Sequence, residues 1–391
     1  MRIAYVCTDP GIPTFGRKGA SVHVQATLTE LVRAGHEVHL VTPRTGGTAP
    51  SPELGSVAVH LLPEIGKGDA AARERRAEAS DAAVVGVLDA LAPDLVYERY
   101  ALWGRSATYW ARAHGVRSVL EVNAPLVEEQ RRFRELVHVA AAEAVAVSAL
   151  THADTVVCVS EPVADWARSV GAPDRAVLVE ANGVDPARIT PADRGPTASE
   201  AAVFTVGFVG TLKPWHGLDV LVDAMEPLLA ADPSWRLLLV GDGPLATELT
   251  DRLAGAGLAD RAELTGAVAP AAVTAQLHRM DVACAPYPAG GSDYFSPLKV
   301  YEYLAAGIPV VASAVGQIPT ALDGGRLGRL VPAGDAAALT AALQTLRDDR
   351  DERRRLRVAG RRAVLATHTW RAVVDRVLAH DAGTSGGARA A

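Results

Sequence analysis

The sequence is poor in cysteine, methionine and aromatic residues and has no long apolar run. Its 391 residues include three cysteines and three methionines, and 5% are aromatic. Cys7, Cys158 and Cys284 form no C-x-x-C pair, which excludes a paired-cysteine motif, and each lies in or ends a short apolar run. We therefore expect buried free thiols in a reducing compartment. No apolar run approaches the ~20 residues of a spanning helix, so we expect no integral membrane segment. Met1 leads into an apolar run without a basic leader, which predicts a cytoplasmic protein.

The chain also lacks an excess of positive charge. Its formal net charge is −6 and its pI is near 6.0, so it offers no general attraction to nucleic acid or to an anionic membrane. We expect small-molecule chemistry and no nucleic acid partner. The composition, 49% apolar and 21% charged, is that of a globular protein, and the length is enough for two hydrophobic cores.

Short β-rich runs alternate with longer helical patterns along the whole chain. This alternation is typical of βαβ units wound on parallel sheets and predicts an α/β fold. In the first half we expect strands at 3–7, 37–42, 57–62, 94–98, 118–122 and 155–160. An Ala- and Glu-rich pattern over 126–150 predicts one long helix with a packing role.

A polar, proline-bearing stretch at 185–200 interrupts this rhythm and predicts a domain boundary. We expect a first domain over 1–187, a second over 200–366 and a disordered Gly- and Ala-rich tail over 382–391. In the second half we expect strands at 203–209, 236–240, 262–265, 282–285 and 310–312, and helices near 335–346, 351–366 and 370–379. Two such Rossmann-like domains can face a ligand across a central cleft with the carboxyl ends of their strands.

Glycine-rich segments after expected strands are candidates for binding phosphate, because helix N-termini present free N–H groups and partial positive charge. The first is PGIPTFGRKGAS at 10–21, where Gly16 and Gly19 let the backbone approach a ligand before a helix expected to begin near Ser21. A flexible surface loop capped by Ser21 is the alternative. The second is GDGP at 241–244, where the proline suits a first helical turn. Alone, this second segment is like many strand-to-helix turns.

A third segment, 294–307, combines an expected helix start with a lysine. Ser296 is a candidate N-cap and Pro297 a candidate first helical residue, so an anion can bind at this helix start. Lys299 and Glu302 are three residues apart and share a helical face. A surface ion pair within one helix, worth ~0–1 kcal/mol, is the alternative.

The loop GTLKPWHG at 210–217 follows the first expected strand of the second domain. It leaves the carboxyl end of that strand, where open α/β sheets bind ligands, so Lys213 and His216 can both reach toward a diphosphate. An ordinary loop in which His216 caps or packs is the alternative. The chain has four lysines among 39 basic residues, and three of them, Lys18, Lys213 and Lys299, lie in these candidate segments. A role on the solvated surface does not explain that concentration.

Further motifs spread a resemblance over nearly the whole chain. They are AGHEV at 34–38, NGVD at 182–185, GFVGTLKPWHG at 207–217, VGDGP at 240–244, LTGAV at 264–268, the helix at 296–307 continuing into IPVV at 308–311, GQIP at 316–319 and LVPAGD at 330–335. Each is modest alone, but their order and spacing are specific. With the opening strand and its glycine loop, the sequence resembles the retaining GT-B glycosyltransferases of family four, the glycosyl transferases group 1.

The resemblance implies a nucleotide sugar donor, a UDP-sugar being favoured, on the second domain. It places a small-molecule or glycan acceptor on the first domain, which a C-terminal helix, 368–381, completes. Glu302 resembles the family glutamate that binds the donor ribose, and Tyr294 stands where the family usually has a second glutamate. The other candidate donor-binding residues are Gly19 and Ala20 near the phosphates, Gly241, Asp242 and Gly243 in the second glycine-rich segment, Gly266 through Val268 beside the base, and Ser296, Pro297 and Leu298 facing the diphosphate and sugar.

Two further departures from the family pattern concern charge and the acceptor side. Thr211 and His216 stand where an arginine and a lysine are usual, and Asn123 replaces a first-domain histidine. We expect Lys213 and Lys299, with His216, to stabilise the departing diphosphate in place of the family cations. Since no Asp-x-Asp sequence follows an expected strand, we expect a reaction without metal or other cofactor. The resemblance to the retaining family implies retention of configuration and no protein nucleophile.

Two alternatives stay open: a non-catalytic GT-B subunit that binds a nucleotide sugar and supports a partner, and a GT-B sugar epimerase. A nicotinamide dehydrogenase is disfavoured, because GFVG at 207–210 and GDG at 241–243 do not make G-x-G-x-x-G with a following acidic ribose ligand. Residues at or just after expected strand ends are candidates to line the acceptor pocket, although the two aromatic ones can equally belong to the core. They are Glu98, Arg99, Tyr100, Trp103 and Asn123.

Overall fold

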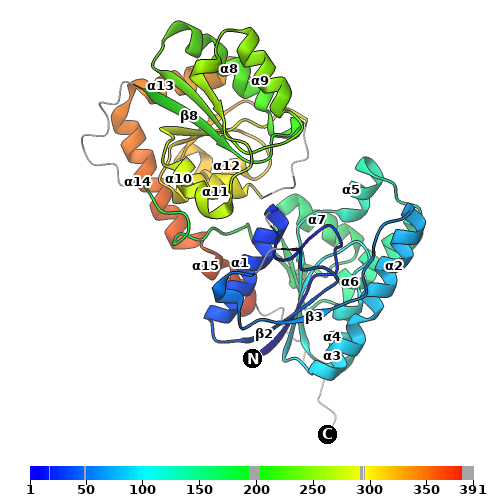
Figure 1. Ribbon diagram of the computed structural model, residues 1–391. Coiled ribbons are helices and arrows are strands. Elements are labelled where there is room, and N and C mark those ends of the chain that lie inside the picture. The colour runs from blue at the N-terminus through cyan, green and yellow to red at the C-terminus, as the bar shows by residue number, and fades with distance from the viewer. Residues whose placement is uncertain (17, 48–49, 193–202, 291–293, 295, 381–391) are drawn as a thin grey trace. The chain divides into compact units, whose positions relative to one another are not determined.

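The computed structural model describes residues 1–16, 18–47, 50–192, 203–290, 294 and 296–380 (Figure 1). It divides into two compact units, Met1–Asn182 with Trp370–Ala391, and Gly183–Thr369. Each is a Rossmann-like α/β domain. The first unit ends at Asn182 rather than at 187. The expected disordered tail, 382–391, lies outside the described residues.

The described part of the first unit holds a seven-stranded parallel sheet in the order β3-β2-β1-β4-β5-β6-β7. Its strands are β1 (Arg2–Val6), β2 (Glu37–Thr42), β3 (Ala58–Leu61), β4 (Leu95–Arg99), β5 (Arg117–Val122), β6 (Thr155–Cys158) and β7 (Val177–Val179). The first six coincide with expected strands. The sequence did not reveal β7, which has three half-buried residues and follows a 3-10 turn, Asp174–Ala176. The strand order changes direction between β1 and β4, the place where open sheets bind ligands.

Helices cover both faces of this sheet. They are α1 (Gly19–Arg33), α2 (Ala70–Ala82), α3 (Val84–Leu91), α4 (Ser106–His114), α5 (Leu126–Phe133), α6 (Val139–His152), α7 (Glu161–Val170) and α15 (Trp370–Ala379). The last of these, α15, packs beside α1 (Figure 1). Arg117 of β5 donates hydrogen bonds to the carbonyl of Leu378 in this helix, at 2.7 Å, and to that of His380 just after it, at 2.9 Å. The C-terminal helix thus belongs to the first unit.

The prediction of one long helix over 126–150 is wrong. The segment is split into α5 and α6, and Arg134 after α5 has an extended backbone. The reason lies in α2, where the buried carboxylate of Glu74 accepts hydrogen bonds from the backbone N–H groups of Val137 and His138, at 2.8 and 2.9 Å. These N–H groups precede α6 and donate to the carboxylate of Glu74 instead of to the carbonyls of a continuous helix.

The second unit holds a parallel sheet of six strands in its described residues, in the order β10-β9-β8-β11-β12-β13. The strands are β8 (Phe204–Val209), β9 (Trp235–Val240), β10 (Ala262–Leu264), β11 (Val282–Ala285), β12 (Val310–Ser313) and β13 (Arg329–Val331). The helices are α8 (Leu218–Ala231), α9 (Ala246–Gly255), α10 (Val273–Leu277), α11 (Leu298–Ala305), α12 (Ile318–Ala321), α13 (Ala336–Asp348) and α14 (Arg350–Thr367). The sequence missed the short β13. It also placed Pro244 in a first helical turn, whereas α9 begins at Ala246, because Leu245 takes the N-cap position.

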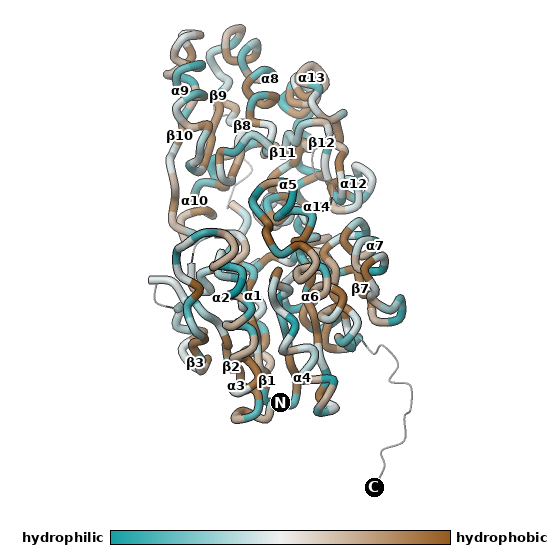
Figure 2. The backbone as a smooth tube through the Cα atoms, turned by 90° about the vertical axis from the view of Figure 1, so that its right-hand side faces the viewer, coloured by the Kyte–Doolittle hydropathy of each residue, from teal (hydrophilic) through white to brown (hydrophobic). Residues whose placement is uncertain are grey.

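Each unit has its own apolar interior. In Figure 2 brown, hydrophobic stretches follow strands such as β1 and β2, whereas the outer helix α9 carries teal, hydrophilic ones. Cys7, Cys158 and Cys284 are buried free thiols, as expected. No helix in the described part of the chain is long and apolar enough to cross a membrane.

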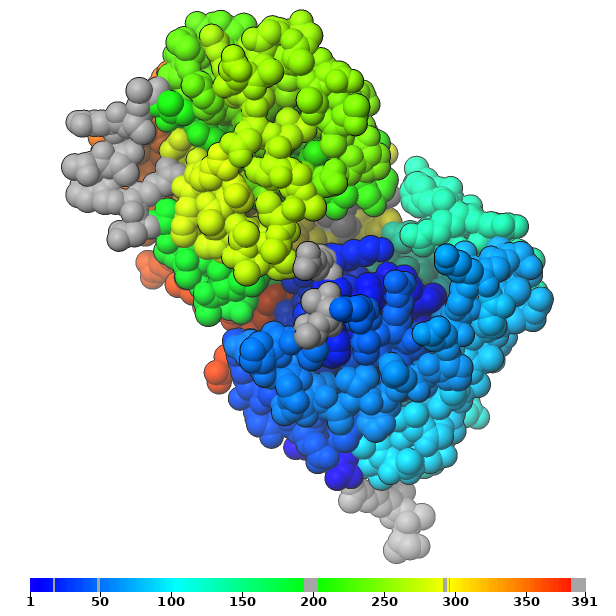
Figure 3. Space-filling model, in the orientation of Figure 1, coloured from blue at the N-terminus to red at the C-terminus, as the bar shows by residue number. Residues whose placement is uncertain are grey.

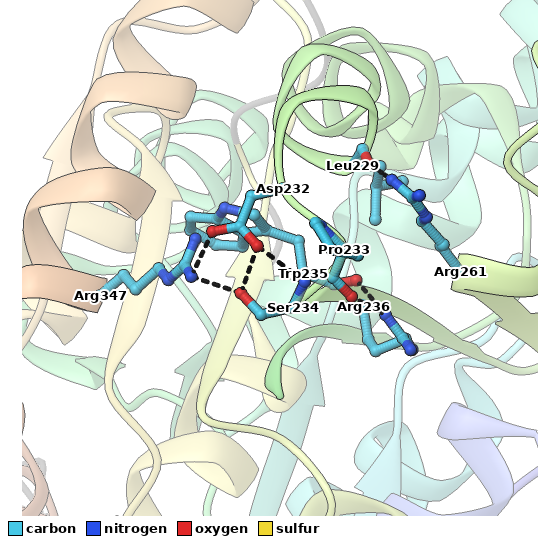
Figure 4. Close-up of polar contacts among 8 residues, drawn as sticks. All are labelled: Leu229, Asp232, Pro233, Ser234, Trp235, Arg236, Arg261 and Arg347. Carbon is cyan, nitrogen blue, oxygen red and sulfur yellow. Dashed lines mark hydrogen bonds and ion pairs between the residues drawn. The ribbon is translucent and has the colours of Figure 1, made fainter. Parts of the chain in front are cut away.

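A polar cluster fixes the amino end of β9, opposite the edge where ligands bind in such sheets. Arg347 of α13 donates to Asp232, at 2.6 Å, and to Ser234, and its guanidinium lies 4.6 Å from the ring centre of Trp235 (Figure 4). Hydrogen bonds from Ser234 and then from Arg347 lower the pKa of Asp232 to about 2. This cluster joins the start of β9 to α8 and α13.

Candidate functional site

The loops that leave β8, β9 and β11 touch through their backbones at the carboxyl edge of the second sheet. The strand order changes direction between β8 and β11, so this edge is the expected ligand-binding edge. A Cβ atom added to Gly217 (φ 67°) would lie 1.7 Å from the carbonyl oxygen of Pro286. One added to Gly241 (φ 138°) would lie 1.9 Å from that of Gly210. Both positions therefore require glycine, and the three loops form one surface of closely packed backbone.

Lys299 of α11 directs its ammonium group toward this surface. Nζ lies 4.3 Å from the ring centre of Phe208 and 5.1 Å from that of Tyr287, and a Cβ atom added to Gly210 would lie 3.4 Å from it. Nζ is buried and has no hydrogen-bond partner among the described residues. Burial lowers the pKa of Lys299 to about 7, with the Glu302 carboxylate acting in the opposite direction. An unpaired buried cation is unfavourable by itself, so the arrangement suits an anionic ligand.

His216 packs against the same two rings, with ring centres 5.8 and 6.0 Å away. Its Nδ1 lies 2.6 Å from the carbonyl oxygen of Thr211. Because a carbonyl only accepts, Nδ1 carries the proton, and Nε2 of the neutral ring is an acceptor. Burial, then Lys299, then Lys213 lower the pKa of His216 to about 4. His216 is therefore neutral at pH 7 in the protein without ligand, and it does not replace the charge of a lysine there.

Lys213 is half-buried in the same loop. Its Nζ is 4.5 Å from the ring centre of Trp215, a cation–π contact, and Trp215 is 56% exposed. The structure thus brings Lys299 and His216 to two shared rings, whereas half-buried Lys213 contacts the exposed ring of Trp215. Of the two lysines, only Lys299 is held in a buried position.

Glu302 forms an ion pair that the sequence did not reveal. Its Oε1 accepts a 2.7 Å hydrogen bond from Arg188, and both side chains are partly buried, with exposed fractions of 20% and 29%. Arg188 follows the NGVD motif, and its carbonyl accepts from Thr274 Oγ1 at 2.7 Å. A basic residue three positions after Asp185 was the available signal. The carboxylate of Glu302 is therefore held in place on one side by Arg188.

The start of α11 differs from expectation. Pro297 takes the N-cap position, with φ −81° and ψ 79°, and Leu298 is the first helical residue. No side chain caps this helix. The prediction that Ser296 caps it and that Pro297 is its first residue is wrong, because Ser296 precedes the N-cap and the cap itself is a proline without a side-chain oxygen. Tyr294 is half buried in a turn, and 291–293 and 295 lie outside the described residues.

The loops after β9 and β10 also meet. Gly241 and Gly266 form an isolated antiparallel bridge, and Val268 beyond it is half buried. Asp242 is exposed and accepts a 2.7 Å hydrogen bond from the N–H of Gly243 through Oδ1. The structure therefore brings the segments 241–243 and 266–268 together beside the loop that follows β8.

In the first unit, α1 begins at Gly19, with Lys18 at the N-cap position. The expected start near Ser21 is wrong, because Ser21 lies inside the first turn with its hydroxyl buried. A Cβ atom added to Gly19 would meet nothing within 4 Å. The N–H groups of Gly19 and Ala20 belong to the first helical turn, which has no intrahelical acceptors for them.

A buried charge network at the ends of β4 and β5 includes two of the expected acceptor-side residues. Oε1 of Glu121 accepts from Arg99 at 2.8 Å, from Asn123 at 2.7 Å and from His23 at 2.9 Å, and Oε2 accepts from Tyr97 at 3.0 Å. Burial raises the pKa of Glu121, but His23, then Arg99 and Asn123, outweigh burial and bring it to about 2. The sequence missed Glu121 and His23. An acidic residue inside the apolar run SVLEV was the available signal.

Glu98 is fully buried below the loop that follows β4. A Cβ atom added to Gly104 would lie 2.8 Å from its Oε1. Burial, and next the charge of Asp81, raise the pKa of Glu98 well above its usual range, which favours the protonated carboxyl group. The group has the environment of a core residue.

A cavity of about 530 Å³ lies at the carboxyl edge of the first sheet (blue to cyan in Figure 3). The loops after β1, β3 and β4 line it together with α2 and α5. Trp103 is among the lining residues, and its polar lining includes Asp9, Arg73 and Gln130. The expected residues Glu98, Arg99, Tyr100 and Asn123 do not line it. No group of three or more His, Cys, Asp or Glu suited to a metal ion occurs among the described residues.

Known proteins match both units. The family described as Glycosyltransferase Family 4 matches residues 17–188, and Glycosyl transferases group 1 matches residues 203–349. The D-inositol 3-phosphate glycosyltransferase of Corynebacterium efficiens is 30% identical over 402 residues, which cover 91% of this chain and 89% of that relative. The phosphatidyl-myo-inositol mannosyltransferase of Mycobacterium leprae is 35% identical over 175 residues, which cover 44% of this chain and less than half of that relative, 45%.

The solved structure of the Anabaena protein HepE in complex with UDP has the same fold. It aligns with a TM-score of 0.73 at 17% identity, covering 97% of this chain and 98% of HepE. A family description matches each of the two Rossmann-like units, and one relative is covered over almost its whole length. The chain belongs to the family 4, or group 1, glycosyltransferases, which have the GT-B fold.

Proposed function

We propose that the protein transfers a sugar from a UDP-sugar to a hydroxyl group of a small-molecule or glycan acceptor, with retention of configuration and without a metal ion. The observation that carries this proposal is the buried ammonium group of Lys299. It lies beside the packed loops after β8 and β9 and has no partner among the described residues. A diphosphate at this place would satisfy it.

Several comparisons support the choice of substrates. HepE is solved with UDP, which favours a UDP-sugar as donor. The two inositol-related names of the relatives favour a polyol-like acceptor with several hydroxyl groups. We place the reaction in the cytoplasm, because the buried thiols of the chain are unpaired, as is usual in a reducing compartment.

The proposed chemistry uses few protein groups. The bond from the anomeric carbon to the diphosphate breaks, and the acceptor oxygen bonds to that carbon on the same face. The acceptor proton passes to the departing diphosphate, so no protein base is required. As negative charge grows on the diphosphate, the Lys299 ammonium stabilises it, and it does so strongly because the site is buried. Neutral His216 accepts a hydrogen bond at Nε2, which suits a sugar hydroxyl better than a phosphate.

Glu302 has the proposed role of binding the ribose of the donor. One of its oxygens accepts from Arg188, and the other is left to accept from a ribose hydroxyl. Arg188 then acts as a positioning residue, because its hydrogen bond fixes the orientation of the carboxylate.

The test is release of UDP from a panel of UDP-sugars by the purified chain, with and without polyol acceptors. We expect acceptor-dependent turnover, and Lys299→Ala should reduce it ~10–100-fold, as expected for loss of one charged hydrogen bond. The anomeric configuration of the product, read by NMR, tests retention. UDP binding without turnover on any acceptor would indicate a non-catalytic subunit. Conversion of the donor sugar without any acceptor would indicate an epimerase.

A further inference from the structure

A second cavity, of about 360 Å³, adjoins the first one on the first unit. The two share Arg73 and the loop residues Pro10 and Gly11. Three cations line the second cavity, namely Arg44 after β2, Lys67 after β3 and Arg73 in the first turn of α2. No Asp or Glu belongs to its described lining. A chain with a net charge of −6 thus has one hollow that is strongly positive.

These three cations are not neutralised by the protein. None forms an ion pair with a described carboxylate, although Arg33 and Arg105 of the same unit do. All three are exposed to solvent. Arg44 makes one long hydrogen bond, 3.4 Å, to the carbonyl of Pro10.

Of the acids near the second cavity in sequence, Glu64 precedes the lining residue Ile65 and is exposed, and the other three accept hydrogen bonds from backbone N–H groups. Asp9 accepts from the N–H of Gly11 and Asp69 from that of Ala72, both at 2.7 Å. Glu74 accepts from the backbone before α6. The positive charge of the cavity is therefore available to a ligand.

The backbone around the cations is held in place. Arg76 of α2 donates to the carbonyls of Ile65 and Lys67, the latter at 2.8 Å. Its guanidinium fills the space beside Gly68, where a Cβ atom would lie 2.9 Å from Nη2. The helix that carries Arg73 has 13 residues, and its N-terminus, capped by the carboxylate of Asp69, lines the first cavity. The backbone that carries Lys67 is thus held in place by α2.

We propose that this second cavity binds a phosphate monoester carried by the acceptor, while the first cavity holds the hydroxyl-bearing body of the acceptor. The proposal deepens the proposed function and depends on it. A phosphate monoester carries about −1.5 to −2 charges at pH 7 and three acceptor oxygens, which match three cations from three separate segments. A neutral polyol would leave these cations unpaired, so the geometry assigns a phosphorylated acceptor class.

Binding is tested first with inorganic phosphate, measured by calorimetry at constant ionic strength with saturating UDP, so that the diphosphate site is filled. We expect Arg73→Gln and Lys67→Gln each to weaken phosphate binding ~3–10-fold, since contacts to exposed charges are worth less than buried ones. The double variant should lose roughly the product of the two effects. Arg75→Gln is the matched control, because Arg75 is an exposed arginine on the same helix that lines neither cavity. An equal loss in the control would overturn the assignment.

The second arm separates an acceptor-borne phosphate from the free ion. Glucose 6-phosphate is compared with glucose, and inositol 1-phosphate with inositol. We expect the phosphorylated member of at least one pair to bind ~10-fold more tightly or more, to compete with inorganic phosphate and to lose its advantage in Arg73→Gln. Equal binding within both pairs, with phosphate still bound, would show an ion site unrelated to the acceptor and would overturn the proposal. Failure of the wild type to bind UDP would instead contradict the proposed function.

Discussion

Replacing Lys299 by methionine should stabilise the protein and weaken donor binding at the same time. Methionine keeps the length of the side chain and packs well against the rings of Phe208 and Tyr287, but it removes the unpaired charge. Burial lowers the pKa of Lys299 from 10.5 in the unfolded chain to about 7. At about 1.4 kcal/mol per pKa unit this difference corresponds to at most ~5 kcal/mol against folding, of which we expect ~1–3 kcal/mol to appear as added stability.

The sign of the pH dependence follows from the same shift. Between pH 7 and pH 10.5 the unfolded chain holds the Lys299 proton and the folded chain does not, so the penalty is complete below pH 7 and fades as the pH rises toward 10.5. The stability advantage of Lys299→Met should therefore be largest at pH 6–7 and smaller at pH 9. UDP affinity should fall ~10–100-fold, the expected loss for one charged hydrogen bond.

The assay is urea unfolding of both proteins at pH 7 and pH 9 without ligand, with UDP binding measured by calorimetry. Lys213→Met is the matched control, because Lys213 is half-buried against the exposed ring of Trp215 and its replacement should leave the unfolding midpoint nearly unchanged. A Lys299→Met protein that is less stable than wild type at pH 7, or that binds UDP as tightly, would refute the argument that an unpaired buried ammonium awaits the diphosphate.

Four further outcomes are expected. UDP should bind with uptake of a proton above pH 7, and its affinity should fall ~10-fold from pH 6 to pH 8, because the diphosphate requires the charged form of Lys299. Calorimetry in buffers of different ionisation enthalpy measures the proton uptake, and a UDP affinity that does not change with pH would contradict this role of Lys299. The loss of activity in His216→Ala should stay constant from pH 6 to pH 9, since the pKa of His216 in the wild type is about 4. A loss that grows toward pH 6 would show that the ring becomes charged when the donor is bound. Glu302→Ala should weaken UDP binding while leaving the melting temperature within a few degrees of wild type. Arg188→Ala should weaken UDP binding less than Glu302→Ala does. Unchanged UDP affinity in Glu302→Ala would contradict the role of Glu302 in binding the ribose. Activity should persist in excess EDTA, and full loss restored by Mg²⁺ would contradict the metal-independent proposal.

The sequence predicted the sheets well because their strands are short apolar runs separated by helical patterns. It failed where a distant side chain decided the backbone. Nothing near 134–138 reveals that Glu74, far earlier in the chain, captures two N–H groups and divides α5 from α6. The strands β7 and β13, of three residues each, were missed, although β10, of the same length, was predicted.

The candidate site was predicted in part for a similar reason. The loops and the single lysine on α11 could be found from glycine and lysine placement. The protonation of His216 could not, because it depends on burial between two rings and on a carbonyl five residues back in the loop. The contact of Arg188 with Glu302 could not be predicted either, because the two residues are more than a hundred positions apart in the sequence. The network around Glu121 also joins residues that are distant in sequence.

The close backbone contacts at Gly217 and Gly241 have a consequence for engineering the protein. Any side chain at either position would overlap a carbonyl of a neighbouring loop by more than an ångström, so a mutagenesis library that randomises these loops would return mostly unfolded members. Libraries aimed at a new donor should vary the exposed residues Trp215 and Asp242, whose side chains point to solvent. Altered sugar preference can then be selected without disturbing the backbone of the proposed nucleotide site.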